Sequence, residues 1–498
     1  MNPQRHNNLS TKLNLCKILA ATAFVIYIVI VYHNSESYVC NLPVEKTLNK
    51  VAAFISSPSL PLPPPSPPAF SPTNVSQLLF CISGSVKAWR NRRSYFREWW
   101  RPNVTRGYIF FDKEPTMDIL PWPYDNLPPY RVSENTTNFE VYSYHVRPDV
   151  IRIVRAILET FREGDTDVRW YIIGDDDTIF FLDNMVELLG RYDHTKYFYI
   201  GGISEGVKSN FDFSFEMAFG GAGCAISYPL AEALVANLDQ CIETYPFYFV
   251  SDQILSACIA DLGVSLTYEK GFHQIDLVGD ISGFLSAHPQ EPLISLHHLD
   301  IVSPLFPTMD RHKSVRHLMT AAKVDQSRLL QQTVCYHKQR NWTFSIAWGY
   351  SAYIYEDLIP RSILRRPLET FTPWSLTKRP PDYIFNTRLV TNNSCETPHM
   401  FYFRSITRLI SNNDSNSNSD TSTDEIKMIY VRHKPRQLPS CYPNHSADYI
   451  SKIRVYAPAT KLNFVEHRGE CCDVINIDGK KTAEIRIRDC KKTEIVIV

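Results

Sequence analysis

The chain has 498 residues, a length that accommodates roughly two or three domains, each with a substantial core. Lysine plus arginine and aspartate plus glutamate both total 52, so the formal net charge is zero. Without a basic surplus, the composition argues against a nucleic-acid-binding protein and favours a neutral or metal-bridged ligand. The 12 cysteines become informative only once the compartment of the protein is known.

An apolar segment near the N-terminus is predicted to direct the chain into the secretory pathway. Residues Ile18–Tyr32 carry no charge, and basic residues precede them. Counted from position 13, the segment has about twenty residues, enough to span a bilayer. Because the basic flank precedes the segment, the sequence predicts a cytosolic tail over residues 1–12, a transmembrane signal anchor over 13–32 and a luminal remainder. A cleaved signal peptide is the alternative, although no small-residue cleavage site follows the segment.

Residues 33–77 are predicted to form a luminal stem. The stretch Ser57–Pro72 is too rich in proline for a helix or sheet and favours an extended, semi-rigid spacer. A proline tract that binds a partner protein is the alternative. Glycosylation sequons on the predicted luminal side start at Asn74, Asn103, Asn135, Asn341, Asn392, Asn413 and Asn444. In this compartment the cysteines other than Cys16 can pair as disulfides.

From Leu78 the pattern indicates an α/β domain, predicted over residues 78–307. Its first predicted strands are Leu78–Ser83, Tyr108–Phe111, Glu140–Tyr144, Val168–Ile173 and Tyr197–Ile200, and its first helices are Lys87–Trp99, Asp149–Phe161 and Asp183–Tyr192, the last capped by Asp183. Alternating strands and helices are typical of a Rossmann-like nucleotide-binding sheet. Asp112 follows the second strand directly and is a candidate contact for a uridine or ribose, with a turn cap as the alternative.

The second half of this domain begins with a polar loop to about Asp212 and a glycine-rich segment, Phe219–Ser227. Gly221 and Gly223 in that segment let the backbone approach a ligand closely, although a simple bend is the alternative. The remaining predicted elements are helices Pro229–Leu238 and Gln253–Leu262 and strands Val264–Tyr268 and Pro292–Leu296.

Residues 308–498 are predicted to form a helix followed by a β-rich, disulfide-containing extension. The helix is predicted over Ser314–Val334, and the strand-like segments are Phe344–Tyr355, Phe401–Ile406, Met428–Arg432, Ile453–Tyr456, Val474–Ile477, Glu484–Arg488 and Glu494–Val498. The disulfides should draw on Cys335, Cys395, Cys441, Cys471, Cys472 and Cys490. Adjacent Cys471 and Cys472 should have different partners, because a vicinal bridge is strained. Zinc ligation is the alternative, and Asn412–Thr423 has the composition of a loop.

Three consecutive carboxylates, Asp175, Asp176 and Asp177, end the predicted strand Val168–Ile173. With no basic neighbour in the sequence, they repel one another unless a cation or hydrogen-bond donors hold them. Oxygen ligands suit Mg²⁺ or Mn²⁺, which complete their shells with substrate phosphates and water. Such an ion neutralises the charge on a departing nucleotide diphosphate. A calcium loop is excluded, because Ile179 occupies the position where another ligand is needed.

Two further positions complete the candidate site. His297 and His298 end the last predicted strand of the domain, and an imidazole there could be a further Mn²⁺ ligand. Transfer to an alcohol also requires a base, and Asp252 precedes a predicted helix whose N-terminal dipole would keep it ionised. Structural histidines and a helix-capping aspartate are the alternatives.

Four motifs, in this order, resemble those of the Fringe-type glycosyltransferases: Asp175-Asp176-Asp177, Gly221-Ala222-Gly223, Ser251-Asp252 and His297-His298-Leu299-Asp300. The chain is more closely similar to a plant Fringe-related group. That similarity rests on Trp99-Trp100-Arg101-Pro102, Arg106-Gly107, Gly271-Phe272-His273-Gln274, Ser295-Leu296, Trp348-Gly349-Tyr350, Phe385-Asn386-Thr387-Arg388 and Cys471-Cys472-Asp473. It covers roughly Leu78 to the C-terminus, and the ordered set is more specific than any single motif.

The resemblance implies a GT-A fold, a UDP-sugar donor, Mn²⁺ or Mg²⁺ as cofactor, a glycan or glycoprotein acceptor, inversion at the anomeric carbon and a type II Golgi membrane protein. By position it implies Asp177 as the main metal carboxylate, His298 as the metal imidazole and Asp252 as the base. Asp175 and Asp176 would hold the donor or metal-bound water. One position departs from the family: Fringe enzymes have paired acids after a proline, whereas here Gln253 follows Asp252.

Two other functions remain open at this point. Acid-x-acid at a strand end also serves phosphatases with a nucleophilic aspartate, although a luminal, disulfide-rich setting and the paired histidines argue against that class. A protein that binds glycans or nucleotide sugars but has lost turnover is favoured by Gln253, which cannot act as a base.

Overall fold

The computed structural model describes residues 71–409, 424–461, 469–478 and 481–496. The predicted tail, signal anchor and most of the stem lie outside these residues, as do the whole Asn412–Thr423 segment and the sequon at Asn413. Within the described ranges, no helix is both long enough and apolar enough to cross a membrane. Of the sequon asparagines that the structure describes, all are exposed except Asn341, which is half-buried.

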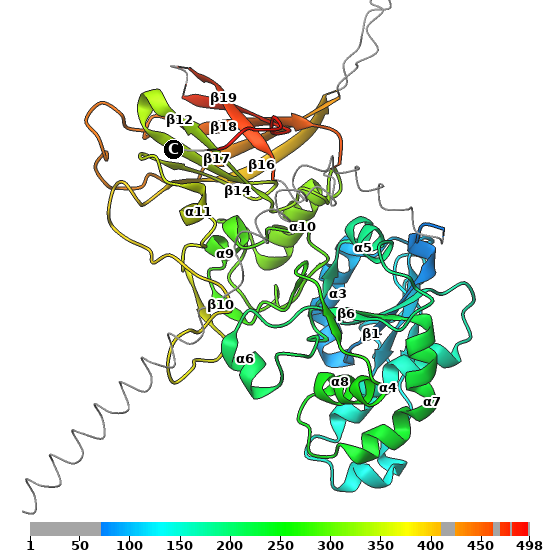
Figure 1. The fold of residues 1–498 in the computed structure, drawn as a ribbon. Coiled ribbons are helices and arrows are strands. Elements are labelled where there is room, and N and C mark those ends of the chain that lie inside the picture. The colour runs from blue at the N-terminus through cyan, green and yellow to red at the C-terminus, as the bar shows by residue number, and fades with distance from the viewer. Residues whose placement is uncertain (1–70, 410–423, 462–468, 479–480, 497–498) are drawn as a thin grey trace, which may run out of the picture. The chain divides into compact units, whose positions relative to one another are not determined.

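A seven-stranded mixed sheet forms the centre of the first region (Figure 1). Its strand order is β3-β2-β1-β4-β7-β6-β8. The first four strands in this order, β3, β2, β1 and β4, are parallel to one another. Strand β7 is antiparallel to both of its neighbours, and β8 is parallel to β6. Their bounds are β1 Leu78–Ser83, β2 Arg106–Phe111, β3 Tyr130–Val132, β4 Trp170–Asp175, β6 Tyr199–Gly201, β7 Cys224–Ser227 and β8 Leu266–Tyr268.

Helices cover both faces of this sheet. Because side chains alternate along a strand, Leu79 and Cys81 of β1 pack on one side with α4, α7 and α8, whereas Phe80 and Ile82 pack on the other with α3 and α5. Burial on both faces explains why β1 is apolar throughout rather than alternating. The helix bounds are α3 Val86–Trp99, α4 Asp149–Arg162, α5 Leu182–Leu189, α7 Tyr228–Thr244 and α8 Ser251–Asp261. A disulfide, Cys241–Cys258, joins α7 to α8.

Two small sheets lie next to the carboxyl end of β4. One has the order β5-β11-β9, formed by Ile179–Phe180, Ser295–Leu296 and Phe272–His273. The other pairs β10, Leu277–Gly279, with β15, Phe371–Pro373, so that residues far apart in the chain become neighbours. The short helices here are α6 Val207–Asp212 and α9 Ser282–Ala287.

The C-terminal region is an eight-stranded sheet (Figure 1) with the order β12-β13-β14-β16-β17-β18-β20-β19. All neighbouring pairs are antiparallel except β18 and β20. The edge strands β12 and β19 contact each other and are joined by the disulfide Cys335–Cys472, so the sheet closes on itself. The bounds are β12 Gln332–His337, β13 Trp342–Ala347, β14 Ser351–Tyr355, β16 His399–Leu409, β17 Glu425–Arg432, β18 Lys452–Pro458, β19 Cys471–Asp478 and β20 Thr482–Arg488, with helices α10 Arg311–Ala322 and α11 Arg361–Leu364.

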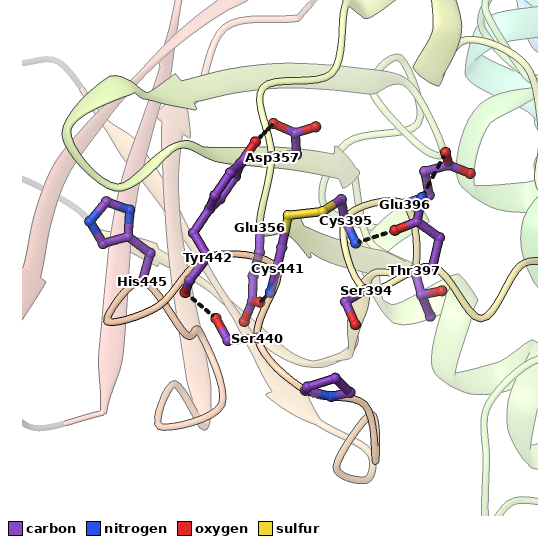
Figure 2. Close-up of a disulfide and its surroundings, with 12 residues drawn as sticks. Glu356, Asp357, Ser394, Cys395, Glu396, Thr397, Ser440, Cys441, Tyr442 and His445 are labelled. Carbon is purple, nitrogen blue, oxygen red and sulfur yellow. Dashed lines mark hydrogen bonds between the residues drawn. A yellow bond between two sulfur atoms is a disulfide. The ribbon is translucent and has the colours of Figure 1, made fainter.

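A buried carboxylate, Glu356, organises the loops beside this sheet. One of its oxygens accepts hydrogen bonds from His399 and the Ala447 amide, and the other accepts from Arg436 and the Cys441 amide. Figure 2 shows Glu356 beside the backbone of Cys441, whose sulfur is bonded to that of Cys395. The disulfide and the carboxylate together fix two loops that are distant in the sequence.

The disulfides agree with the cysteine analysis. Cys471 pairs with Cys490 and Cys472 with Cys335, so the adjacent cysteines do have different partners. Because all six predicted cysteines are bonded in pairs, the zinc alternative is wrong. Cys81 and Cys224 are buried free thiols within the described residues.

Three local predictions are wrong. Residues 140–144 are not a strand, because Glu140–Ser143 forms a 3₁₀ turn in which the Ser143 hydroxyl donates to the Glu140 carbonyl. The polar loop ending at Asp212 contains helix α6. Asp183 is not the cap of its helix, since α5 begins at Leu182 and the Asp183 carboxylate pairs with Arg101.

The helix predicted over Ser314–Val334 is also too long. Helix α10 ends at Ala322, and the chain then enters strand β12 at Gln332. Between them the Asp325 carboxylate accepts hydrogen bonds from the Ser327 amide and hydroxyl. These local bonds replace the helical ones and end the helix. No strand is present in the described part of Glu494–Val498.

Candidate active site

The three consecutive carboxylates lie at the carboxyl end of β4, as the sequence predicts. Asp175 is the last residue of the strand, and Asp176 and Asp177 form the turn that follows. The Thr178 hydroxyl bonds to the Asp175 amide and to the Gly221 carbonyl, which fixes this turn against the glycine-rich segment. Asp176 and Asp177 are almost completely buried, at 1% and 2% exposure. Their charges must therefore be balanced within the protein.

Arg92 of helix α3 supplies that balance. Its guanidinium donates to Asp176 at 2.7 Å, lies 2.9 Å from Asp177 and donates to Asp300 at 3.1 Å. Burial alone would lower the pKa of Arg92, but the three carboxylates outweigh it and raise that pKa. Burial also raises the pKa of Asp176 to about 6, an effect that Arg92 opposes. The triplet thus has a basic neighbour in space, although it has none in the sequence.

His297 provides an imidazole on the other side of the triplet. Its Nε2 lies 3.1 Å from Asp177 Oδ1 and 3.9 Å from Asp175 Oδ2. Burial would lower the pKa of His297, but Asp177 and Asp175 raise it to about 9. The same contact lowers the pKa of Asp177 against the effect of its burial. Asp177 and His297 are therefore a tightly coupled ion pair.

His298 lies beside this pair but has different partners. Its backbone φ is +60°, a left-handed conformation that is uncommon for a histidine. Its Nδ1 is 3.4 Å from Asp276, and its ring stacks on that of Trp374 at 4.8 Å. The ligand atoms of Asp177, His297 and His298 all lie within 4.8 Å of one another. Both predicted histidines thus reach the triplet, with His297 in direct contact.

The glycine-rich segment packs against His297. A methyl group on Gly221 would lie 2.2 Å from the His297 ring, so only glycine fits there. Gly223 has a φ of +84°, which glycine adopts without strain, and strand β7 begins at the next residue. The Ala222 amide between them donates to Gln274 at 2.7 Å. In this structure the segment therefore positions the histidine, and its contact with a ligand remains a prediction.

Asp252 shares a narrow cavity of about 20 Å³ with Asp175 and Gly220. It lies in the first turn of α8, where its carboxylate accepts hydrogen bonds from the Gly220 amide and the Ser251 hydroxyl. Burial raises the pKa of Asp252, which opposes the effect that the helix N-terminus has on the charged form. The candidate base thus shares a cavity with Asp175, the first residue of the triplet.

Two other predicted positions have structural partners. Asp112 accepts a hydrogen bond from the Val86 amide at 2.9 Å, which is a capping contact at the start of α3. The Gln253 side chain accepts from the Phe249 amide and donates to the Phe213 carbonyl, so it ties together the two segments that flank α8. Gln253 is turned away from the cavity that Asp252 lines.

Four residues around the site were missed from the sequence: Arg92, Asp276, Asp300 and Trp374. Asp300 ends the motif His297-His298-Leu299-Asp300 but was given no role, and Arg92 lies three residues after Trp89 and four before Phe96 on the buried face of α3. A charged residue among buried aromatic ones requires a partner. Trp374 comes from the predicted C-terminal extension, and nothing in its local sequence indicates the contact with His298.

Comparisons with known proteins find relatives that match part of the chain. The chain is 28% identical over 137 residues to the human protein named Beta-1,3-glucosyltransferase, and 28% identical over 125 residues to the mouse protein of the same name. The matched segments span about a quarter of this chain, 26% and 24%, and the same shares of the two relatives. With a carboxylate and histidine site at the edge of a mixed α/β sheet, the chain is glycosyltransferase-like.

The particular family is shown by a second match. The family described as "Protein of unknown function, DUF604" matches residues 209–472, which is more than half of the chain. The chain belongs to this family. The matched range includes Asp252, both site histidines and most of the eight-stranded sheet, whereas the carboxylate triplet precedes it.

Proposed function

We propose that this protein is a metal-dependent glycosyltransferase. It moves a sugar, a hexose or an N-acetylhexosamine, from a UDP-sugar to a glycan hydroxyl with inversion, on a GT-A-type sheet. The N-terminal signal anchor holds it in the Golgi membrane with the catalytic region in the lumen. The single observation that carries the proposal is the contact of Asp177 with His297 at the carboxyl end of β4, where Asp175 of the same triplet lines a cavity with Asp252.

The residues present fit a divalent ion. Asp177, His297 and His298 offer one oxygen and two nitrogen ligands within 4.8 Å of one another, a donor set that suits Mn²⁺. The carboxylates of Asp177 and Asp175 raise the pKa of His297, so a divalent ion at this position would compete with a proton for the imidazole. When bound, the ion would neutralise negative charge that builds on the leaving diphosphate.

The protein's own side chains then have separate roles. Arg92 holds Asp176 and one oxygen of Asp177, which leaves the other oxygen of Asp177 directed toward His297. Asp252 accepts the proton of the acceptor hydroxyl, and its raised pKa makes it a stronger base than an exposed aspartate. Asp276 orients the His298 ring through Nδ1, as carboxylates commonly do for metal-bound histidines.

Gln253 is compatible with this assignment. Both ends of its side-chain amide are engaged by backbone groups of Phe249 and Phe213, so its contribution is structural. The acid that faces Asp175 is Asp252, and the base belongs at that position. A binding protein without turnover is the competing function, and the same experiment separates the two.

The test uses the purified full-length chain with a panel of UDP-sugars, with and without Mn²⁺. We expect Mn²⁺-dependent release of UDP with one donor, and transfer when a glycan acceptor is supplied. Asp252→Asn should keep donor binding and lose transfer by roughly 100- to 10,000-fold. Asp261→Asn, at the far end of the same helix, is the matched control.

Three results would contradict the proposal. Normal turnover by Asp252→Asn would remove it as the base. Binding of UDP-sugars with neither hydrolysis nor transfer would favour the binding protein instead. Release of phosphate from a simple ester, without any reaction of UDP-sugars, would favour the phosphatase.

A further inference from the structure

A second cluster of metal-binding side chains lies outside the candidate active site. It consists of Glu205, before helix α6, His273, at the end of β9, and His288, directly after α9. One ligand atom from each lies within 4.8 Å of the others. Glu205 and His273 are almost completely buried, and His288 is half-buried.

This cluster and the candidate active site lie on opposite faces of the same small sheet. His273 of β9 pairs in register with Leu296 of β11, and His297 is the residue that follows Leu296 in the sequence. Because successive side chains point to opposite faces, His273 and His297 are directed away from each other. The two histidine clusters are therefore separate.

The hydrogen bonds of Glu205 leave one nitrogen of His273 without a partner. One oxygen of Glu205 lies 2.8 Å from His273 Nδ1, and the other accepts from the Ile275 amide at 2.7 Å. A carboxylate can only accept, so Nδ1 is the donor, and in the neutral imidazole Nε2 is then the acceptor nitrogen. That Nε2 is buried, and no described residue forms a hydrogen bond with it. Leaving a buried nitrogen unpaired is costly, and a bound cation would remove the cost.

His288 is held close to the His273 ring by packing. Its ring stacks on Phe284 at 4.6 Å and lies 4.1 Å from Phe385, while the centroid of the His273 ring is 5.6 Å away. Two protonated imidazoles at this separation would repel each other. Burial and the neighbouring His273 lower the pKa of His288 well below its ordinary value, which favours the neutral imidazole that binds metals.

All three residues line a cavity of about 920 Å³. Lys270, Arg365 and Asn386 also line it, so its wall is polar and partly basic. An ion on the histidines would have its remaining coordination positions directed toward this space, where water or an anionic ligand can complete them.

We propose that His273 and His288 bind a transition-metal ion, with Zn²⁺ as the preferred one, at a site separate from the Mn²⁺ site. Glu205 is a positioning residue, since it fixes the His273 tautomer in the manner of carboxylate–histidine–zinc triads. Two imidazoles and no protein carboxylate in direct contact favour Zn²⁺ over Mn²⁺ or Mg²⁺.

The test is a titration of the metal-free, full-length chain with Zn²⁺ against a chromophoric chelator, followed by the visible spectrum of the Co²⁺ form. We expect one bound equivalent that His273→Gln and His288→Gln lose and that Asp177→Asn retains. Glu205→Gln should weaken this binding by about 10- to 100-fold. His337→Gln, another half-buried histidine, at the end of β12, is the matched control and should bind like the wild type.

His288→Gln is the decisive variant, because the His288 side chain forms no hydrogen bond with any described residue and its loss should leave the fold intact. Circular dichroism and thermal unfolding check that expectation. Unchanged Zn²⁺ binding and an unchanged Co²⁺ spectrum in His288→Gln would overturn the proposal. Loss of all Zn²⁺ binding in Asp177→Asn would overturn it too, because the ion would then belong to the candidate active site.

Discussion

Two regions of the molecule bury carboxylates in opposite ways. In the eight-stranded region, Glu356 is completely buried, and its two oxygens receive four hydrogen bonds, from His399, Arg436 and two backbone amides. At the edge of the seven-stranded sheet, the carboxylates contact Arg92 and His297, yet several buried polar atoms there have no hydrogen-bond partner among the described residues. They include Asp176 Oδ2, Asp300 Oδ1 and His297 Nδ1.

The difference is the one expected between a charge that stabilises the fold and charges that serve a ligand. A buried carboxylate whose oxygens all accept hydrogen bonds from the protein holds loops together and requires no ligand to balance its charge. Buried polar atoms without partners carry a cost that the fold alone does not offset, and such groups concentrate at functional sites. The comparison predicts that changes at Glu356 affect stability, whereas changes at the triplet affect chemistry.

The largest expected effect is on activity, from Asp177→Asn. The amide cannot serve as the charged ligand of a divalent ion, and the ion contributes several kcal/mol, so UDP release and transfer should fall by roughly 1000-fold. Steady-state assays with the active UDP-sugar, with and without Mn²⁺, measure this. Asp183→Asn, an exposed acid nearby, should behave like the wild type. Equal turnover in the two variants would contradict the idea that the triplet acts in chemistry whereas Glu356 acts in stability.

The next effect is on stability, from Glu356→Gln. This change leaves Arg436 buried without its counter-charge and should reduce the free energy of unfolding by about 3 kcal/mol. Urea unfolding followed by circular dichroism measures the loss, and turnover per folded molecule should be unchanged. A variant of normal stability would mean that the hydrogen bonds of Glu356 contribute little.

A somewhat smaller effect is expected from Gly220→Ala. The added methyl would lie 2.5 Å from Asp252 Oδ1 and would displace that carboxylate. A shift of the base by about 1 Å can cost roughly 100-fold in turnover, whereas donor affinity should stay the same. Gly263→Ala is the comparison variant. Its added methyl would have no atom within 4 Å, so it tests a glycine substitution at positive φ that does not touch the candidate site. If Gly220→Ala also lowered the affinity for the donor, its effect would not be confined to the displacement of Asp252.

The smallest effects are opposite pH dependences of stability in the metal-free protein. The pKa of Glu356 is lowered in the fold, against its burial, by His399 and backbone amides, so its stabilisation is present above its ordinary value of 4.5 and is lost as pH falls. The pKa of His297 is raised from 6.5 to about 9, so its stabilisation is complete below pH 6.5 and is lost as pH rises through 9.

Unfolding measured across this pH range checks both signs. The stability difference between wild type and Glu356→Gln should shrink at low pH, and that between wild type and His297→Gln should shrink at high pH. If both stability differences changed with pH in the same direction, the two buried groups would not be held as described.

Much of the fold was predictable because strand and helix patterns are local. Strand β1 has the bounds that its apolar run predicts, and the triplet ends β4 as expected. The separate partners of Cys471 and Cys472 followed from the strain of a vicinal bridge. The errors fell where a short side chain bonds to the nearby backbone, as at Ser143 and Asp325, since such bonds override periodicity.

The partners of the site residues were not predictable. Arg92 precedes Asp176 by 84 residues, and Trp374 follows His298 after a long excursion through the eight-stranded sheet. The contact between β12 and β19, which closes that sheet, joins strands more than a hundred residues apart. No local pattern contains this information.

The sequence by itself determined the candidate site residues: consecutive acids after a buried strand, paired histidines after another, and an acid at the start of a helix. Only the tertiary structure decided what each of them contacts, that Arg92 balances the acids, that His297 rather than His298 touches Asp177, and that a second histidine cluster lies behind the same small sheet. The physical reason is that periodicity and composition report the burial of a residue, whereas the charge state and ligand geometry depend on neighbours brought together by the crossing of distant segments.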